Sequence, residues 1–131
     1  MEETSLYKGT SVKELSKKDF KLNNNSMPSL LLKKDGFLMC YANWCPHCRN
    51  KVQMWCSLAS ELKDTDFVIC SLDCVKYKEI SNSLGISGIP RVFYFNKNGK
   101  MEDYTETIAP KELLNYACDA KNLLCEKRKK K

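Results

Sequence analysis

The sequence predicts an α/β fold, in which helices flank a central mixed β-sheet. The apolar runs Phe37–Tyr41 and Phe67–Leu72 are typical of buried strands. Between them, from about Pro46 to Lys63, apolar side chains recur every three or four positions, which indicates an amphipathic helix. A strand, a helix and a second strand in this order form a crossover unit, and such units pack helices against a parallel pair of strands.

The elements of the N-terminal part are short. We interpret residues 1–11 as a flexible leader, because they are polar and lack a periodic apolar pattern. A first strand is predicted at Val12–Leu15. After an Asn-rich loop, Ser26 is a candidate N-cap for a short helix over Pro28–Lys34, with the proline in its first turn. Gly36 would end that helix before the central strand begins.

The C-terminal part predicts a helix, a hairpin and a last helix. The first helix covers Tyr77–Leu84, and Gly85 follows it. Strands Arg91–Phe95 and Met101–Thr105 flank an Asn-Lys-Asn-Gly turn, which is typical of a β-hairpin and makes the sheet mixed. Pro110 opens the last helix. The domain then covers residues 12–125, with a basic tail at 126–131. The buried stripe of the last helix is predicted to consist of Leu113, Ala117, Ala120 and Leu124.

Composition fits one globular domain and excludes a membrane-spanning class. The chain has 131 residues, of which 43% are hydrophobic and 29% charged. No apolar run approaches a membrane span of ~18 residues, and residues 1–10 contain no apolar core, so we expect no signal peptide and a cytoplasmic protein. The net charge is +6, and residues 127–131 supply five of those charges. This tail is typical of a solvated end; contact with nucleic acid or an acidic surface is the alternative.

The motif Cys45-Pro46-His47-Cys48 carries the chemistry. It follows the predicted strand Phe37–Tyr41 directly and opens the amphipathic helix. The first N–H groups of a helix lack internal partners and lie at its positive end, which lowers a thiol pKa there. We therefore expect Cys45 to be the reactive thiol, with its thiolate also stabilised by His47, and Cys48 to close a disulfide with it. Trp44 would shield the site, and Tyr41 would belong to the core.

Six of the eight cysteines lie outside this motif, and their state has to be predicted separately. Without an export signal we expect thiols rather than a disulfide framework. Cys118 and Cys125 lie seven apart in a predicted helix, about 10 Å along its axis, which is too far for a disulfide if the helix is unbroken. Together with Cys45 and Cys48, the pair Cys70 and Cys74 has a spacing close to that of a four-cysteine zinc site, so a structural zinc site stays open as an alternative. Small, buried apolar positions are predicted for Cys40, Cys56, Cys70 and Cys118.

These residues resemble the thioredoxin superfamily. The resemblance rests on the strand, on Trp-Cys-x-x-Cys opening a helix, and on Gly88-Ile89-Pro90 before a strand and hairpin. Within the superfamily, the motif with Tyr41, Ala42 and Asp73 is most similar to the catalytic domain of protein disulfide isomerases. Its Cys-Pro-His-Cys tetrapeptide resembles that of the bacterial periplasmic disulfide oxidase. The resemblance implies a thioredoxin fold, a cis proline at Pro90 facing the cysteines, and substrate hydrogen bonds from the backbone of Ile89.

Three positions depart from the family pattern. Met39 stands where relatives carry a buried acid six residues before the first cysteine, and Ser71 stands where isomerases carry its lysine partner. Losing both together leaves no buried charge unpaired, but it removes the usual route for the proton of Cys48. Gln53 replaces a helix proline, which predicts a straighter helix.

The sequence thus predicts a thiol–disulfide oxidoreductase that oxidises or isomerises protein substrates through Cys45 and Cys48. Trp44, Ile89 and Pro90 would contact the substrate, and Pro46 and His47 would belong to the catalytic motif. We expect protein thiols and disulfides as partners, a recycling redox partner, no cofactor and no metal. The alternative is a non-catalytic or zinc-binding interaction module. Small proteins of this kind also resemble components of disulfide pathways in large DNA viruses, so a virion location would fit.

Overall fold

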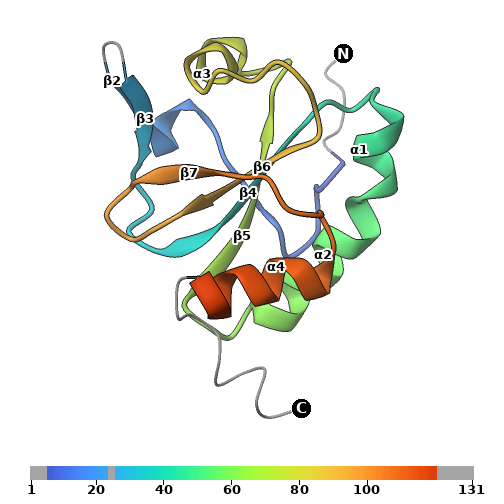
Figure 1. Cartoon of the computed structure of the whole chain (residues 1–131). Helices are drawn as coiled ribbons and strands as arrows, with labels where there is room; N and C mark the ends of the chain where they lie inside the picture. Colours follow the sequence, from blue (N-terminus) through green and yellow to red (C-terminus); the bar gives the residue numbers. More distant parts are fainter. Residues whose placement is uncertain (1–5, 24–25, 121–131) are drawn as a thin grey trace.

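A central β-sheet organises the protein, whose computed structural model describes residues 6–23 and 26–120. In chain order its strands are β1 (Lys13–Glu14), β4 (Asp35–Tyr41), β5 (Phe67–Asp73), β6 (Arg91–Phe95) and β7 (Met101–Tyr104). In space the order is β1-β5-β4-β6-β7 (Figure 1). The β1–β5 and β4–β5 pairs are parallel, whereas the β4–β6 and β6–β7 pairs are antiparallel. The predicted mixed sheet is therefore confirmed.

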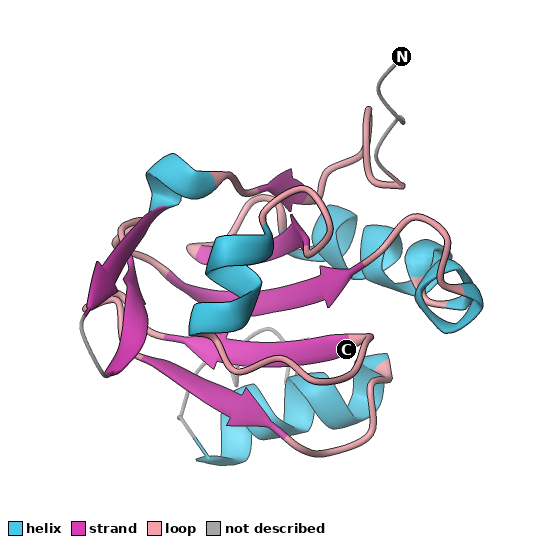
Figure 2. Ribbon diagram, turned by 90° about the horizontal axis from the view of Figure 1, so that it is seen from above, coloured by secondary structure: helices cyan, strands magenta, loops and turns pink. Residues whose placement is uncertain are grey.

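Helices cover both faces of this sheet (Figure 2). They are α1 (Pro46–Asn50), α2 (Val52–Leu62), α3 (Lys78–Ser83) and α4 (Pro110–Asn115). Helix α4 continues as a π-helical turn over Tyr116–Ala120. None of the described helices is long and apolar enough to cross a membrane.

Alternation along β4 divides the buried side chains into two cores. The first core lies under α2 and α4 and contains Phe37, Met39 and Tyr41 of β4, Trp55 and Leu113. The second core lies under α3; it contains Leu38 and Cys40 of β4, Cys70 and Leu72 of β5, and Ile80. The predicted stripe of the last helix reaches the first core through Leu113 and Ala117, which are fully buried. The side chain of Ala120 and residue Leu124 lie outside the described part.

The predicted helix over Pro28–Lys34 is wrong. This segment instead forms strand β3 (Ser26–Leu30), which pairs antiparallel with β2 (Phe20–Asn23). Pro28 and Leu30 are buried whereas Met27 is exposed, so the burial alternates with the period of a strand. A proline fits here because a two-stranded hairpin consists of edge strands, which need not use every N–H in a ladder. Tertiary pairing has overridden the helical propensity of the leucine run.

The long helix predicted from Pro46 to Lys63 is interrupted at Lys51. Its backbone (φ −95°, ψ −7°) departs from helical values, and its N–H bonds to the carbonyl of Cys48 at 3.1 Å, a three-residue step. A regular four-residue bond resumes from the N–H of Trp55 to the carbonyl of Lys51, at 2.9 Å. Whether this helix is straighter than in relatives stays a prediction; within this chain it is interrupted although it lacks the proline, because proline is not the only residue that can interrupt a helix.

The hairpin turn at residues 96–99 is confirmed. Gly99 has a φ of 88°, a conformation that glycine adopts without strain, and its N–H bonds back to the carbonyl of Asn96 at 2.9 Å. A Cβ at Gly99 would lie 2.5 Å from the carbonyl oxygen of Leu30. The turn thus needs glycine both for its own backbone and for the approach of β3.

The segment before residue 12 takes part in the packing. Tyr7 has only 1% of its surface exposed and belongs to the first core, and Leu6 packs against it. The backbone N–H of Leu6 donates to the side-chain oxygen of Asn43, at 3.2 Å. Residues 6 and 7 therefore join the domain that the sequence predicts to begin at residue 12.

Candidate active site

The two cysteines of the motif lie where β4 passes into α1. The N–H of Cys45 bonds to the carbonyl of Ala42 at 3.2 Å, which turns the chain out of the sheet. Cys45 is the N-cap residue of α1, Pro46 is its first residue, and the N–H of Arg49 bonds to the carbonyl of Cys45 at 3.0 Å. Cys48 follows one turn later, and both side chains belong to the first core. Both cysteines are free thiols.

The two thiols have opposite electrostatic surroundings. Burial opposes ionisation of Cys45, but three hydrogen bonds outweigh it and lower the pKa of this thiol: from the backbone N–H and thiol of Cys48, and from the backbone N–H of His47. Burial raises the pKa of Cys48 to about 12, and the neighbouring Cys45 adds to this rise. Cys45 is 5% exposed and Cys48 is fully buried. When the pair ionises, its negative charge is therefore held on Cys45.

The side chains beside the motif face solvent. Trp44 is 64% exposed, the highest value among the large apolar side chains of the described residues. The side chains of Pro46 and His47 are also exposed. The contact between His47 and Cys45 runs through the backbone N–H of His47. A direct role for the imidazole, as the sequence suggested, stays a prediction.

Ile89 and Pro90 come to the same end of the sheet. The peptide bond between them is cis. Pro90 immediately precedes β6, whose first residue, Arg91, is paired with Cys40 of β4. Ile89 is partly buried and packs against the first core, which includes Cys45 and Cys48. Residues separated by about forty positions in the sequence thus meet at the edge where a substrate would approach the thiols.

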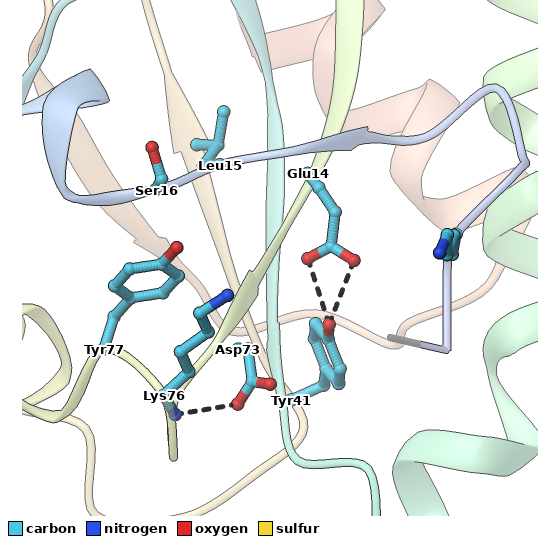
Figure 3. A pocket seen from close by; sticks show the side chains of 8 residues that line it. Glu14, Leu15, Ser16, Tyr41, Asp73, Lys76 and Tyr77 are labelled. Atoms are coloured by element: carbon cyan, nitrogen blue, oxygen red, sulfur yellow. Dashed lines mark hydrogen bonds between the residues drawn. The ribbon is translucent and has the colours of Figure 1, made fainter. Parts of the chain in front are cut away.

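The carboxylate of Glu14, which the sequence analysis did not identify, lines a cavity of about 270 Å³ beside Tyr41 (Figure 3). The hydroxyl of Tyr41 donates to the Glu14 carboxylate, with distances of 3.0 and 3.2 Å to its two oxygens. Glu14 lies on β1, in register with Ser71 of β5. Because β5 lies between β1 and β4, the side chain of Glu14 reaches across β5 to Tyr41 of β4. Burial raises the pKa of Glu14, and the bond from Tyr41 opposes that rise. Asp73, Lys76 and Tyr77 line the same cavity.

Tyr7 packs against Tyr41 in the first core. Its ring meets that of Tyr41 edge-on, with 5.2 Å between the centroids. Burial raises the pKa of Tyr7 most, and negative charge on Cys56, Cys48 or Glu14 raises it further. The phenol of Tyr7 therefore lies within electrostatic reach of both Cys48 and Glu14. No local motif could reveal this cluster, because its members come from three separate segments.

The other cysteines fall into separate places. Cys40 and Cys70 are fully buried, as predicted, whereas Cys56 is only partly buried. Cys70 and Cys74 adjoin the second core, on the opposite face of the sheet from Cys45 and Cys48. The two pairs therefore do not converge on one zinc site. Among the residues that the structure describes, no group of three or more His, Cys, Asp or Glu is arranged to hold a metal ion.

Cys118 departs from the expectation. It is half-buried and disulfide-bonded, so the prediction of a free, fully buried thiol is wrong. Cys125 and the basic tail at 126–131 lie outside the described residues.

Comparison with known proteins agrees with this architecture. The family model for thioredoxin matches residues 11–119. Protein disulfide isomerase-like 2-2 of Oryza sativa subsp. japonica is 40% identical over 73 residues, which cover 54% of this chain and 20% of that protein. Protein disulfide-isomerase A5 of Bos taurus is 31% identical over 84 residues, covering 62% of this chain and 16% of that protein. The chain thus spans a fifth or less of the length of these relatives.

A solved structure extends the likeness to three dimensions. The first thioredoxin domain of mouse protein disulfide-isomerase A4 superimposes with a TM-score of 0.60 and 25% sequence identity, over 68% of this chain and 64% of that one. The family match covers most of the chain, and the sheet order, the helices on both faces and the Cys-x-x-Cys at the end of β4 accompany it. The chain therefore belongs to the thioredoxin superfamily and is similar to the catalytic domains of protein disulfide isomerases.

Proposed function

We propose that this protein exchanges disulfides with protein substrates through Cys45 and Cys48. The observation that carries the proposal is the opposite shift of two neighbouring thiol pKa values, lowered at Cys45 and raised at Cys48. Thiolates attack disulfides, and thiols do not. Cys45 is therefore the group that meets the substrate, and Cys48 is held back as a protonated thiol until a mixed disulfide has formed.

In the reducing direction, the Cys45 thiolate attacks one sulfur of a substrate disulfide and releases the other as a substrate thiolate. Cys48 then loses its proton and attacks Cys45, which closes the Cys45–Cys48 disulfide and releases the second substrate thiol. In the oxidising direction a substrate thiolate attacks Cys45, and Cys48 leaves. A second substrate thiol then displaces Cys45. Each cycle moves two electrons, so a recycling redox partner must restore the starting state.

The substrate would lie across the exposed end of the sheet. Trp44 and Val75 are 64% and 59% exposed, and they follow the carboxyl ends of the neighbouring parallel strands β4 and β5. Apolar side chains at a surface suit contact with unfolded or extended protein segments. Ile89, which precedes the cis proline, would offer its backbone to such a segment. The cytoplasmic or virion location and the role of the basic tail stay predictions.

Glu14 is the proton acceptor we assign to the resolving step. Cys48 must lose a proton although its pKa is about 12, and Met39 leaves the strand beside it without an acid. Glu14 would take that role through Tyr41, whose hydroxyl donates to it at 3.0 Å, and through water in the cavity beside it, while Tyr7 lies within electrostatic reach of both Cys48 and Glu14. Its raised pKa improves the carboxylate as a base near neutral pH.

Insulin reduction tests the proposed function. With dithiothreitol as electron donor, the wild-type protein should accelerate the precipitation of reduced insulin chains, and Cys70→Ala should do so equally, since Cys70 lies in the second core. Zinc content of the same preparation separates the alternative class. Stoichiometric bound zinc together with no acceleration would replace the oxidoreductase with a zinc-binding interaction module.

A further inference from the structure

A second pair of thiols lies under the active-site edge, on the other face of the sheet. Cys40 is in β4, and Cys74 is the first residue after β5. Cys40 is in register with Leu72, and the backbone N–H of Cys74 donates to the carbonyl of Tyr41 at 2.9 Å, which continues the ladder. Because side chains alternate along a strand, Cys74 shares the face of Leu72 and therefore of Cys40.

The two thiols are in contact but differ in access. Cys40 is fully buried in the second core, whereas Cys74 packs against that core and is only half-buried. The side chains of Cys40 and Cys74 interact through a hydrogen bond, and the Cys74 thiol also lies 3.8 Å from the carbonyl oxygen of Leu72, to which it donates. The bond between the two side chains, helped by the hydroxyl of Ser81, lowers the pKa of Cys74, while burial raises the pKa of Cys40. The accessible sulfur is thus the one that ionises, and the buried one keeps its proton.

We propose that Cys40 and Cys74 form a second redox-active dithiol, which low-molecular-weight disulfides of the glutathione class oxidise to an intramolecular disulfide. This site is distinct from the proposed exchange site, although Cys48 lies within electrostatic reach of both of its thiols. It lies against the second core, whereas the motif cysteines belong to the first. Closing this disulfide would link β4 to the turn before α3, close to the end of β4 that leads to Cys45.

The chemistry proceeds in two exchanges. The Cys74 thiolate attacks one sulfur of the small disulfide, forms a mixed disulfide and releases one small thiolate. Cys40 then gives its proton to that thiolate and attacks the sulfur of Cys74, which releases the second small thiolate; this takes from water the proton that Cys74 gave up on ionising. The protein loses two hydrogen atoms, and the small disulfide is reduced to two thiols. Since Cys74 begins the turn over residues 74–77, a local adjustment can bring the two Cα atoms within the ~7 Å that a disulfide allows.

Peptide mapping tests this site directly. The chain with Cys45→Ser and Cys48→Ser is incubated while folded with glutathione disulfide, its free thiols are blocked, and it is digested with trypsin. Residues 35–49 then contain one cysteine, Cys40, and residues 64–76 contain Cys70 and Cys74. We expect these two peptides to be joined by a disulfide in most of the protein. If the double variant does not fold, the chain with both motif cysteines is used; its residues 35–49 carry three cysteines, so fragmentation of the linked peptides must then assign the bond to Cys40.

Matched variants identify the sulfur. Cys70 lies on the same strand and face as Leu72 but on the side away from Cys74, so Cys70→Ala should keep the link and Cys74→Ala should abolish it. Three results would overturn the proposal: no link at equilibrium in folded protein, a stable glutathione adduct on Cys74, or a link that is lost in Cys70→Ala and kept in Cys74→Ala. Insulin reduction by the Cys74→Ala variant should remain, which keeps this outcome separate from the proposed function.

Discussion

Cys45→Ser should reduce disulfide exchange to the uncatalysed background. The hydroxyl that replaces the thiol is not ionised at neutral pH and cannot form a disulfide, so neither direction of exchange can begin. Cys45 is also the member of the pair whose pKa is lowered, so its loss removes the attacking thiolate itself. Insulin reduction measures the effect. Cys56→Ala is the matched control, since Cys56 packs against the same core but lies beyond the interruption at Lys51; it should retain activity.

Cys48→Ser should behave differently from Cys45→Ser. Its Cys45 thiolate can still attack a substrate disulfide, but the thiol that resolves the mixed disulfide is missing. Covalent complexes with substrate should therefore accumulate and be visible on non-reducing gels, and they should disappear with dithiothreitol. Trapping by Cys45→Ser, with none by Cys48→Ser, would mean that the two roles are reversed.

Glu14→Gln should slow the resolving step by about a hundredfold at neutral pH, the lower end of the range expected for loss of a general base. The glutamine keeps a hydrogen-bonding oxygen for Tyr41 but cannot accept the proton. In the wild type, the resolving rate should rise with pH as Glu14 ionises and then level off. Because burial raises the pKa of Glu14, this rise should be centred above the ordinary value of ~4.3. Stopped-flow release of substrate from the mixed disulfide measures the rate at each pH.

The shape of the pH profile distinguishes proton transfer from a structural effect. In Glu14→Gln the resolving rate should depend on direct ionisation of Cys48, whose pKa is about 12, and should keep rising up to high pH until it meets the wild-type rate. Tyr41→Phe should show the same profile. Glu79→Gln is the control, because Glu79 is exposed and forms a surface ion pair with Lys17, 3.5 Å away. A Glu14→Gln profile that is parallel to the wild type, merely lower, would refute the assignment.

The sequence was sufficient to predict those elements whose structure is decided by neighbouring residues along the chain. The run Phe37–Tyr41 is a central strand because five successive apolar residues are buried on both faces of a parallel pair. The turn ending at Gly99 follows from the conformation of that glycine. By contrast, Leu30–Leu32 looked helical, yet Leu30 pairs with Phe20 and packs into the second core. The choice between helix and strand there depends on a partner strand that periodicity alone does not reveal.

For the candidate site, too, the residues within a local motif were predictable and those brought in by strand pairing were not. Cys45 and Cys48 carry a motif within four residues, and their place at the start of a helix follows from the strand before them. Glu14 and Tyr7 carry no motif. They reach the site because β1 pairs with β5 and because the preceding segment folds into the first core. Likewise Cys74 meets Cys40 only through the register of β4 with β5. Contacts that depend on register cannot be found from spacing along the chain.

Equilibration of the Cys45–Cys48 pair with glutathione buffers tests the central claim most directly. The hydrogen bonds that lower the pKa of Cys45 stabilise the reduced form, and a more stable reduced form makes the disulfide a stronger oxidant. We predict a two-electron transition between dithiol and disulfide with a midpoint more oxidising than the ~−270 mV of thioredoxin, where ~30 mV corresponds to ~1.4 kcal/mol. A midpoint at or below that of thioredoxin would contradict the oxidising assignment. Failure of Cys45 and Cys48 to form a disulfide at any buffer ratio would contradict the exchange function itself.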